Sequence, residues 1–191
     1  MKRRLVFLVL LLSSCSTSSA GPTVTPPPHI EAEEYAVYSA LVRQNPIGID
    51  LGTSFVVREQ TVSGLDLLES TLEHHKLPGS LVDSYRSRNA MVYTLSPNLD
   101  IEQAYTMLPQ VEFERIFLHT KGSVWTPFQE AYPEAGGMIA FSRVGFDQEG
   151  EKALAQFGFR CGDLCGAGGL YLLSKDNGNW VVQEALMIWQ S

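Results

Sequence analysis

Four strand-like runs follow one another through the C-terminal third of the chain, and they constrain its fold more than any other feature. The runs read GGMIAFSRVGFD, EKALAQFGFRCG, GGLYLLSKD and NWVVQEALMIWQ. Asn177 and Gly178 separate the last two runs, and both residues tolerate the positive φ angles of a tight hairpin turn. Short connections between successive runs predict a four-stranded antiparallel meander. The side chains that we expect to face its core are Ala153, Ala155, Phe157, Phe159, Trp180 and Val182.

The chain ahead of these strands carries helix signals. Residues 30–44 predict an amphipathic helix, because Tyr35, Tyr38 and Val42 lie at helical spacing and acidic residues fill the first turn. Further helices are expected over 63–76 and 78–89, and short strands over 55–60 and 91–95. Residues 97–131 are ambiguous: VEFERIFLH (111–119) fits a strand or a helix, and TPFQEAY (126–132) predicts a turn of helix after Trp125. The sequence therefore predicts an α+β fold in which N-terminal helices pack on the C-terminal meander.

The N-terminus has the layout of a secretory signal. Three basic residues precede eight consecutive apolar ones, a run too short to cross a bilayer as a helix. The motif LSSC that follows, at residues 12–15, resembles the lipobox of bacterial lipoproteins. That resemblance implies cleavage after residue 14 and attachment of acyl chains such as palmitate to Cys15. Cleavage after Ala20, as in an ordinary secretory signal, is the alternative and would remove Cys15.

The same resemblance implies a lipoprotein of the bacterial cell envelope, held in the membrane by the acyl chains on Cys15. Ser16, rather than an aspartate, follows the anchor, which favours the outer membrane in a Gram-negative cell. Residues 1–14 are then the signal peptide, 15–29 a lipid anchor with a disordered Ser/Thr/Pro-rich tether, and 30–191 a single globular domain.

The charge balance restricts the partners of this domain. The chain contains 21 acidic and 14 basic residues, and three of the basic ones belong to the expected signal. So acidic a protein is a poor ligand for nucleic acid. The expected partners are the membrane, through the anchor, and an envelope protein or a small ligand.

Cys161 and Cys165 are the two cysteines that remain once Cys15 is acylated. Exported chains meet an oxidising environment in many bacteria, so we expect these two to form a disulfide. A zinc site needs about four ligands, and no second cysteine pair or His-x-x-x-His motif accompanies them. Their spacing differs from that of thioredoxin-like motifs, and the glycines that follow lack the lysine of a phosphate-binding loop. No metal or cofactor is therefore expected.

The segment FSRVGFD…CGDLCGAGGLYLLSKDNGNWVV, with WTPFQEAYP before it, resembles the C-terminal half of uncharacterised bacterial proteins, many of them lipoproteins. The resemblance covers about 70 of the 191 residues and implies no activity.

The sequence contains none of the common catalytic motifs. An envelope hydrolase with a cleft around Ser142, Arg143 and His119 is nevertheless an alternative function, because catalytic groups assemble from distant positions. It requires His119, Ser142 or acids such as Glu112 and Glu114 to converge in one pocket within hydrogen-bond reach.

Arg143 lies within a strand-like run, and two interpretations of it are open. The structural one pairs it with an acid such as Glu184 on a neighbouring strand. The functional one makes it a bidentate contact for an anion in a cleft that Ser142, Trp125 and Tyr132 also line. The function that the sequence favours is a non-catalytic lipoprotein domain that binds a protein or a ligand.

Overall fold

A computed structural model describes residues 28–191, apart from the side chains of residues 187 and 188. The expected signal peptide (1–14), Cys15 and nearly all of the expected tether (15–29) lie outside the described residues. The helices are α1 (Ala32–Gln44), α2 (Leu65–Leu72), α3 (Gly79–Arg88), α4 (Gln110–Phe113), the π-helical turn η1 (Glu114–Leu118) and α5 (Trp125–Ala131). The strands are β1 (Ser54–Arg58), β2 (Ala104–Leu108), β3 (Met138–Phe141), β4 (Gly145–Phe146), β5 (Lys152–Gly162), β6 (Cys165–Asp176) and β7 (Asn179–Gln190).

The described strands form one mixed sheet of seven strands in the order β2-β1-β3-β5-β6-β7, with β4 paired to β5. Strands β3, β5, β6 and β7 pair antiparallel with one another, whereas β1 runs parallel to both β2 and β3. The predicted α+β class and the antiparallel pairing of the C-terminal strands are therefore confirmed. The meander that the sequence suggested is not a separate unit, because β1 and β2 extend the sheet beyond β3.

The turns between the C-terminal strands follow from local sequence. Asn177 and Gly178 have φ angles of 50° and 81°, and they connect the paired residues Asp176 and Asn179 of β6 and β7. These positive angles suit asparagine and glycine, as the two-residue hairpin predicts. At the opposite end of β6, the predicted disulfide joins Cys161 to Cys165 across a Cα–Cα distance of 5.1 Å and closes the β5–β6 hairpin.

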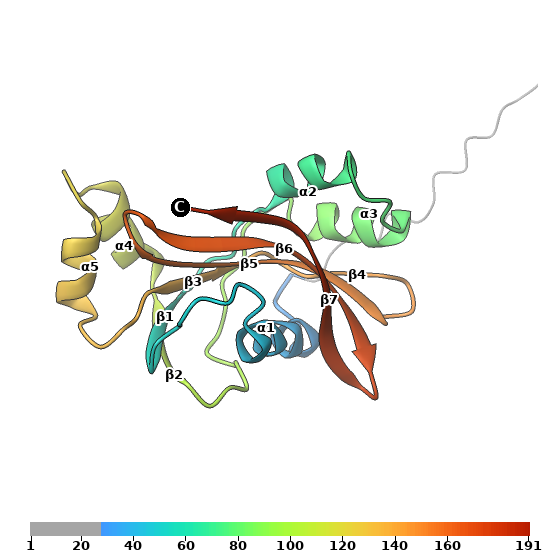
Figure 1. The fold of residues 1–191 in the computed structure, drawn as a ribbon, viewed down its shortest axis with the longest axis horizontal. Helices are drawn as coiled ribbons and strands as arrows, with labels where there is room; N and C mark the ends of the chain where they lie inside the picture. Colours follow the sequence, from blue (N-terminus) through green and yellow to red (C-terminus); the bar gives the residue numbers. More distant parts are fainter. Residues whose placement is uncertain (1–27) are drawn as a thin grey trace, which may run out of the picture.

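Helix α1 covers one face of the sheet, and the main hydrophobic core lies between them (Figure 1). Alternate residues of β5 point toward α1, so Ala153, Ala155, Phe157 and Phe159 are all fully buried, as predicted. The ring of Tyr38 on α1 stacks on Phe141 with centroids 4.6 Å apart. Among the other two predicted core residues, Trp180 is buried whereas Val182 is only partly buried.

Two separate groups of helices lie on the opposite face of the sheet (Figure 1). Helices α2 and α3 cover β5 and β6, where Leu154 and Leu170 join their hydrophobic cluster. Helices α4, η1 and α5 cover the other end, where Val56 and Met138 are buried beneath Trp125 and its aromatic neighbours. The strip of sheet between the two groups lies at the bottom of a cleft.

The segment 91–131 differs most from its prediction. Residues 91–95 form only one isolated bridge, between Thr94 and Gln60, rather than the predicted strand. Leu95 is buried and Tyr93 packs on the main core, but Met91 and Val92 are exposed, and the backbone of this run pairs with residues 59–61 only briefly. Within the ambiguous 97–131 stretch, a strand forms at β2 and the run VEFERIFLH becomes α4 and η1.

Candidate ligand-binding cleft

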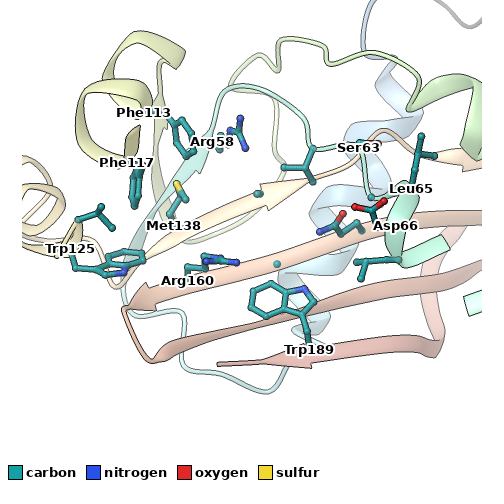
Figure 2. A pocket seen from close by; sticks show the side chains of 17 residues that line it. Arg58, Ser63, Leu65, Asp66, Phe113, Phe117, Trp125, Met138, Arg160 and Trp189 are labelled. Carbon is teal, nitrogen blue, oxygen red and sulfur yellow. The ribbon is translucent and has the colours of Figure 1, made fainter. Parts of the chain in front are cut away.

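The cleft between α2 and the α4–α5 group has a volume of about 710 Å³. This volume lies within the range of small-molecule sites, roughly 300–1,000 Å³. Met138, Ala140, Gln156 and Gly158 from β3 and β5 form its floor, on the face opposite to α1. Figure 2 shows its walls, with Phe113, Phe117 and Trp125 at one end and Leu65 and Asp66 of α2 at the other.

Small residues on β5 and β6 let a tryptophan lie flat against this part of the sheet. Gly158 pairs with Gly168 across the two strands, and Trp189 of β7 passes over both. A β-carbon on Gly168 would lie 2.8 Å from Cζ2 of Trp189 and would displace its ring. The glycines therefore allow the indole to line the cleft as one of its walls.

Two arginines enter the cleft from different strands, Arg58 at the end of β1 and Arg160 near the end of β5 (Figure 2). Each guanidinium stacks on an aromatic ring, with Arg58 4.1 Å from the centroid of Phe113 and Arg160 5.0 Å from that of Trp189. Within the described part of the chain, neither arginine forms an ion pair with a carboxylate.

Arg58 is the more deeply placed of the two. Its Nε atom is buried without a hydrogen-bond partner in the described residues. Burial lowers the pKa of the Arg58 guanidinium from its usual value, but arginine still stays charged at neutral pH. A buried donor on a permanent cation is costly unless an acceptor reaches it, so an anion bound here would relieve that cost.

The aromatic end of the cleft consists of Phe113, Phe117, Val124 and Trp125. The ring centroid of Phe117 lies 5.0 Å from that of Phe113 and 5.6 Å from that of Trp125, which it meets edge to face. Such spacing is typical of favourable aromatic pairs and gives this end a rigid apolar surface. Trp125 lines this cleft, although not beside Arg143 and Ser142, whereas Tyr132 packs on Phe128 and does not line the cleft.

The opposite end, which we call the α2 end, is formed by residues 63–67 and Gln156. Gly64 has a φ angle of 64°, and a β-carbon on it would lie 2.2 Å from Oη of Tyr85 and 2.6 Å from Oε1 of Gln156. Oε1 of Gln156 is a buried acceptor without a donor in the described residues. Asp66 is exposed, and it has no ion-pair partner among those residues either.

Arg143 is not in the cleft: it pairs with an acid, as the structural interpretation expects, but the acid is Glu34 and not Glu184. Its side chain is fully buried and forms a two-atom contact with Glu34 of α1, in which Nε donates to Oε2 over 3.1 Å. The guanidinium also donates to the carbonyl of His29 and stacks 4.3 Å above the ring of Tyr93. Glu184 is half-exposed on β7, and its Oε1 lies 3.5 Å from Nδ1 of His75 instead.

Further groups complete the Glu34 site. The Glu34 carboxylate accepts hydrogen bonds from Arg88 and from the backbone N–H of Val144. Tyr38 donates to the carbonyl of Ser142 over 2.9 Å, and burial together with the Glu34 charge raises the pKa of Tyr38. The tyrosine therefore stays protonated as a donor, and the whole cluster is a closed structural network.

The residues of the alternative hydrolase do not converge. The Ser142 hydroxyl is buried, donates to the carbonyl of Arg143 over 2.9 Å and accepts from the N–H of Gln156 over 2.8 Å. His119 is exposed at the end of η1 and has no contact with Ser142. Glu112 pairs with Arg115, which lowers its pKa, and Glu114 accepts a hydrogen bond from Gln110.

Sequence reasoning missed the arginines that do share a cleft. A weak signal was present, because Arg58 alternates with the buried Phe55 and Val57 and so faces away from the main core. Arg160 alternates with Phe157 and Phe159 in the same way. What the sequence does not contain is the parallel pairing of β1 with β3, which brings the two strands onto one sheet.

No protein-family model, no curated protein and no solved structure matches the chain. The resemblances to bacterial lipoproteins and to uncharacterised envelope proteins therefore stay predictions. Across residues 28–191, none of the helices has both the length and the hydropathy to span a bilayer. Over the same range, no group of three or more His, Cys, Asp or Glu side chains is arranged to hold a metal ion.

Proposed function

We propose that this chain is a non-catalytic, lipid-anchored binding protein of the bacterial cell envelope, and that its cleft binds a small ligand with a negatively charged group. The observation that carries the ligand class is the pair Arg58 and Arg160, which enter one cleft without a carboxylate partner among the described residues. An acidic chain has many carboxylates with which to neutralise them, so two cations left at one cleft, Arg58 partly buried and Arg160 exposed, point to an anion from outside.

The geometry of each arginine supports the same conclusion. Stacking on Phe113 and Trp189 holds both guanidinium planes in place while their edges stay available for hydrogen bonds. A guanidinium held in this way loses little conformational freedom when it binds a carboxylate or a phosphate. The arginines therefore suit recognition of an anion more than general solubility.

The cleft favours binding over catalysis. Arg58, Arg160 and Asp66 are its only ionisable side chains among the described residues, and arginine is too weak an acid to transfer protons at neutral pH. Ser142 and His119, the pair required by a hydrolase, lie outside the lining of this cleft.

The location is supported by sequence. A basic cluster, a short apolar run and the LSSC motif precede the domain, which is the layout expected of an acylated Cys15. We expect mass spectrometry of the chain from envelope membranes to find residue 15 as the N-terminus with acyl chains attached. A chain that begins after Ala20 would contradict the anchor without affecting the cleft.

The cleft can be tested with the acyl-free mature chain (residues 15–191), its disulfide oxidised, titrated with the anionic aromatic probe 8-anilinonaphthalene-1-sulfonate. We expect Arg58→Gln and Arg160→Gln each to weaken probe binding about tenfold, since a charge-assisted hydrogen bond contributes roughly 1.5–3 kcal/mol. Arg43→Gln is the matched control, because Arg43 is an exposed arginine paired with Asp100 outside the cleft. Equal affinities for all three variants and the wild type would contradict the proposal.

A further inference from the structure

Resting on the proposed function, we propose that the ligand is a zwitterionic amphiphile in which an apolar chain, an anionic group and an amine follow one another. A monoacyl phospholipid with an ethanolamine head group has this order. The inference comes from the distribution of side-chain chemistry along the cleft, which changes from aromatic to cationic to hydrogen-bond accepting (Figure 2).

The aromatic end fits the apolar chain. Its rings are already held by one another and by the buried Phe128, which lies 5.1 Å from Trp125. A chain that enters here meets apolar surface without forcing a polar group out of water. An inorganic anion or a short carboxylate would leave this end of the cleft filled with water.

The arginines fit the anionic group, and Figure 2 shows them between the two ends. Arg58 approaches from the β1 side and Arg160 from the β5 side, and the inference requires an anion between them that accepts hydrogen bonds from both. A phosphate has enough oxygen atoms to do so while remaining bonded to a chain on one side and a head group on the other.

The α2 end fits an amine. Oε1 of Gln156 is a buried acceptor that lacks a donor in the described residues, and the Asp66 carboxylate lies at the same end of the cleft. The arginines of the protein would then meet the anionic group of the ligand, and Asp66 with Gln156 would meet its ammonium group. A fatty acid or an alkyl phosphate has no donor of this kind and would leave the Gln156 oxygen without a partner.

Two small-molecule sources share the combination of anion and amine. Free aromatic amino acids carry both charges, but they lack a chain long enough to extend from the α2 end past the arginines into the aromatic end. Monoacyl phospholipids carry the chain as well, and they occur in the membrane to which the proposed anchor attaches this domain. We therefore assign the cleft to the lipid, and the amino acid serves as a separate arm of the test.

The test compares two lipids that share the acyl chain and the phosphodiester and differ in the terminal ammonium group. Myristoyl lysophosphatidylethanolamine and myristoyl lysophosphatidylethanol are titrated below their micellar concentrations, with intrinsic tryptophan fluorescence, to which Trp125 and Trp189 of the cleft contribute, as the readout. We expect the wild type to prefer the ethanolamine lipid roughly fivefold, as one partly exposed ion pair allows. Asp66→Asn should abolish this preference without weakening the binding of lysophosphatidylethanol. Asp83→Asn is the matched control, since Asp83 is an exposed acid on α3 that does not line the cleft.

The outcomes separate this inference from the proposed function. Arg58→Gln should weaken both lipids equally, because both carry the phosphate. Equal binding of the two lipids by the wild type, or an equal loss for both lipids in Asp66→Asn, overturns the zwitterionic ligand but leaves the anion site intact. Binding of L-phenylalanine, which does not absorb where tryptophan is excited, as tight as that of the ethanolamine lipid overturns the requirement for an acyl chain. Lipid binding that does not depend on Arg58 overturns the proposed function itself.

Discussion

Two arginine sites lie on opposite sides of one sheet, and they are built in opposite ways. Beneath α1, Arg143 meets a buried carboxylate, a backbone carbonyl and an aromatic ring, so its charge is neutralised within the protein. Across the sheet, the guanidinium groups of Arg58 and Arg160 stack on aromatic rings and form no ion pair within the described residues. The first arrangement fixes how α1 sits on the sheet, whereas the second leaves a cation open to a ligand.

The difference shows that neither burial nor a strand position identifies a functional arginine. Arg143 is the most buried of the three and attracts attention in the sequence, but its surroundings satisfy it. Arg58 is only partly buried, yet it has a buried nitrogen without an acceptor. A functional arginine is recognised by the hydrogen-bond donors that the protein leaves without an acceptor, rather than by the fraction of its surface that is buried.

The largest expected effect concerns the closed site. Glu34→Gln removes the carboxylate that faces both Arg143 and Arg88, and loss of one partner from a buried ion pair costs about 3–5 kcal/mol. We expect the free energy of unfolding, measured in urea, to fall by that amount. Glu31→Gln is the control, because Glu31 pairs with the same Arg88 at the surface, and it should cost less than about 1 kcal/mol. Similar losses for both variants would contradict a structural role for the Glu34 network.

A smaller effect is expected at the α2 end of the cleft. Gly64→Ala places a β-carbon against Tyr85 and Gln156 at a positive φ angle, whereas Gly150→Ala has a similar angle of 69° with open space around it. The angle alone costs about 1–2 kcal/mol for alanine. We expect Gly64→Ala to destabilise the fold by more than this and to weaken ligand binding, and Gly150→Ala to have only the backbone cost. Equal losses of unfolding free energy would show that the contacts at Gly64 are not tight.

The disulfide variant affects the two sites differently. Replacing both cysteines, Cys161→Ser with Cys165→Ser, opens a loop of only a few residues, which should cost roughly 2 kcal/mol of unfolding free energy. Arg160 precedes Cys161 directly, so we expect probe affinity in the cleft to fall about threefold while the Glu34 site, which is remote from the hairpin, is unaffected. Unchanged affinity would show that Trp189 alone holds Arg160 in position.

The smallest expected effect depends on pH. Glu33, on the exposed side of α1, accepts a hydrogen bond from Trp180 over 2.7 Å and lies 2.9 Å from the Lys175 ammonium. Burial acts to raise the pKa of Glu33, but these partners outweigh it and lower the pKa below its usual value. A carboxylate of lowered pKa stabilises the folded state above its unfolded pKa, about 4.3, and loses this contribution as the pH falls further.

Glu33→Gln should therefore reduce stability at pH 7 and make no difference at pH 2. We expect the difference at pH 7 to stay below about 1 kcal/mol, because the side chain is 48% exposed and solvent screens the pair. Urea denaturation of both proteins at the two pH values measures it. A constant difference across this range would mean that the charge of Glu33 contributes nothing.

Local signals explain most of what the sequence predicted. The α1 helix, the Asn177-Gly178 turn and the Cys161–Cys165 bridge each depend on residues within about one turn or hairpin of one another, and all three are confirmed. The parallel pairs of β1 could not be predicted in this way. Val56 pairs with Met138, and no turn signal specifies contacts between strands that lie so far apart in sequence.

The candidate site shows the same limit. Glu34 lies one helical turn before Tyr38 on the buried side of α1, which marks it as an acid in need of a buried cation. Arg143 is that cation. The partner that the sequence predicts for Arg143 is instead Glu184, which is closer to it along the chain than Glu34 is. Arg58 and Arg160 stand on strands whose adjacency depends on β3, so their shared cleft becomes visible only in three dimensions.

The ion pair beneath α1 also limits how early this domain can fold, because both partners must first have been made. Glu34 and Arg143 are separated by 109 residues, and ribosomes add roughly 5–20 residues per second. Arg143 is therefore synthesised several seconds after Glu34. Until then, α1 has no charged partner for Glu34 and no aromatic ring of Phe141 on which to stack Tyr38. The first helix of the described residues therefore cannot dock through this pair until Arg143 has been made, and a chain that ends before β3 leaves α1 undocked.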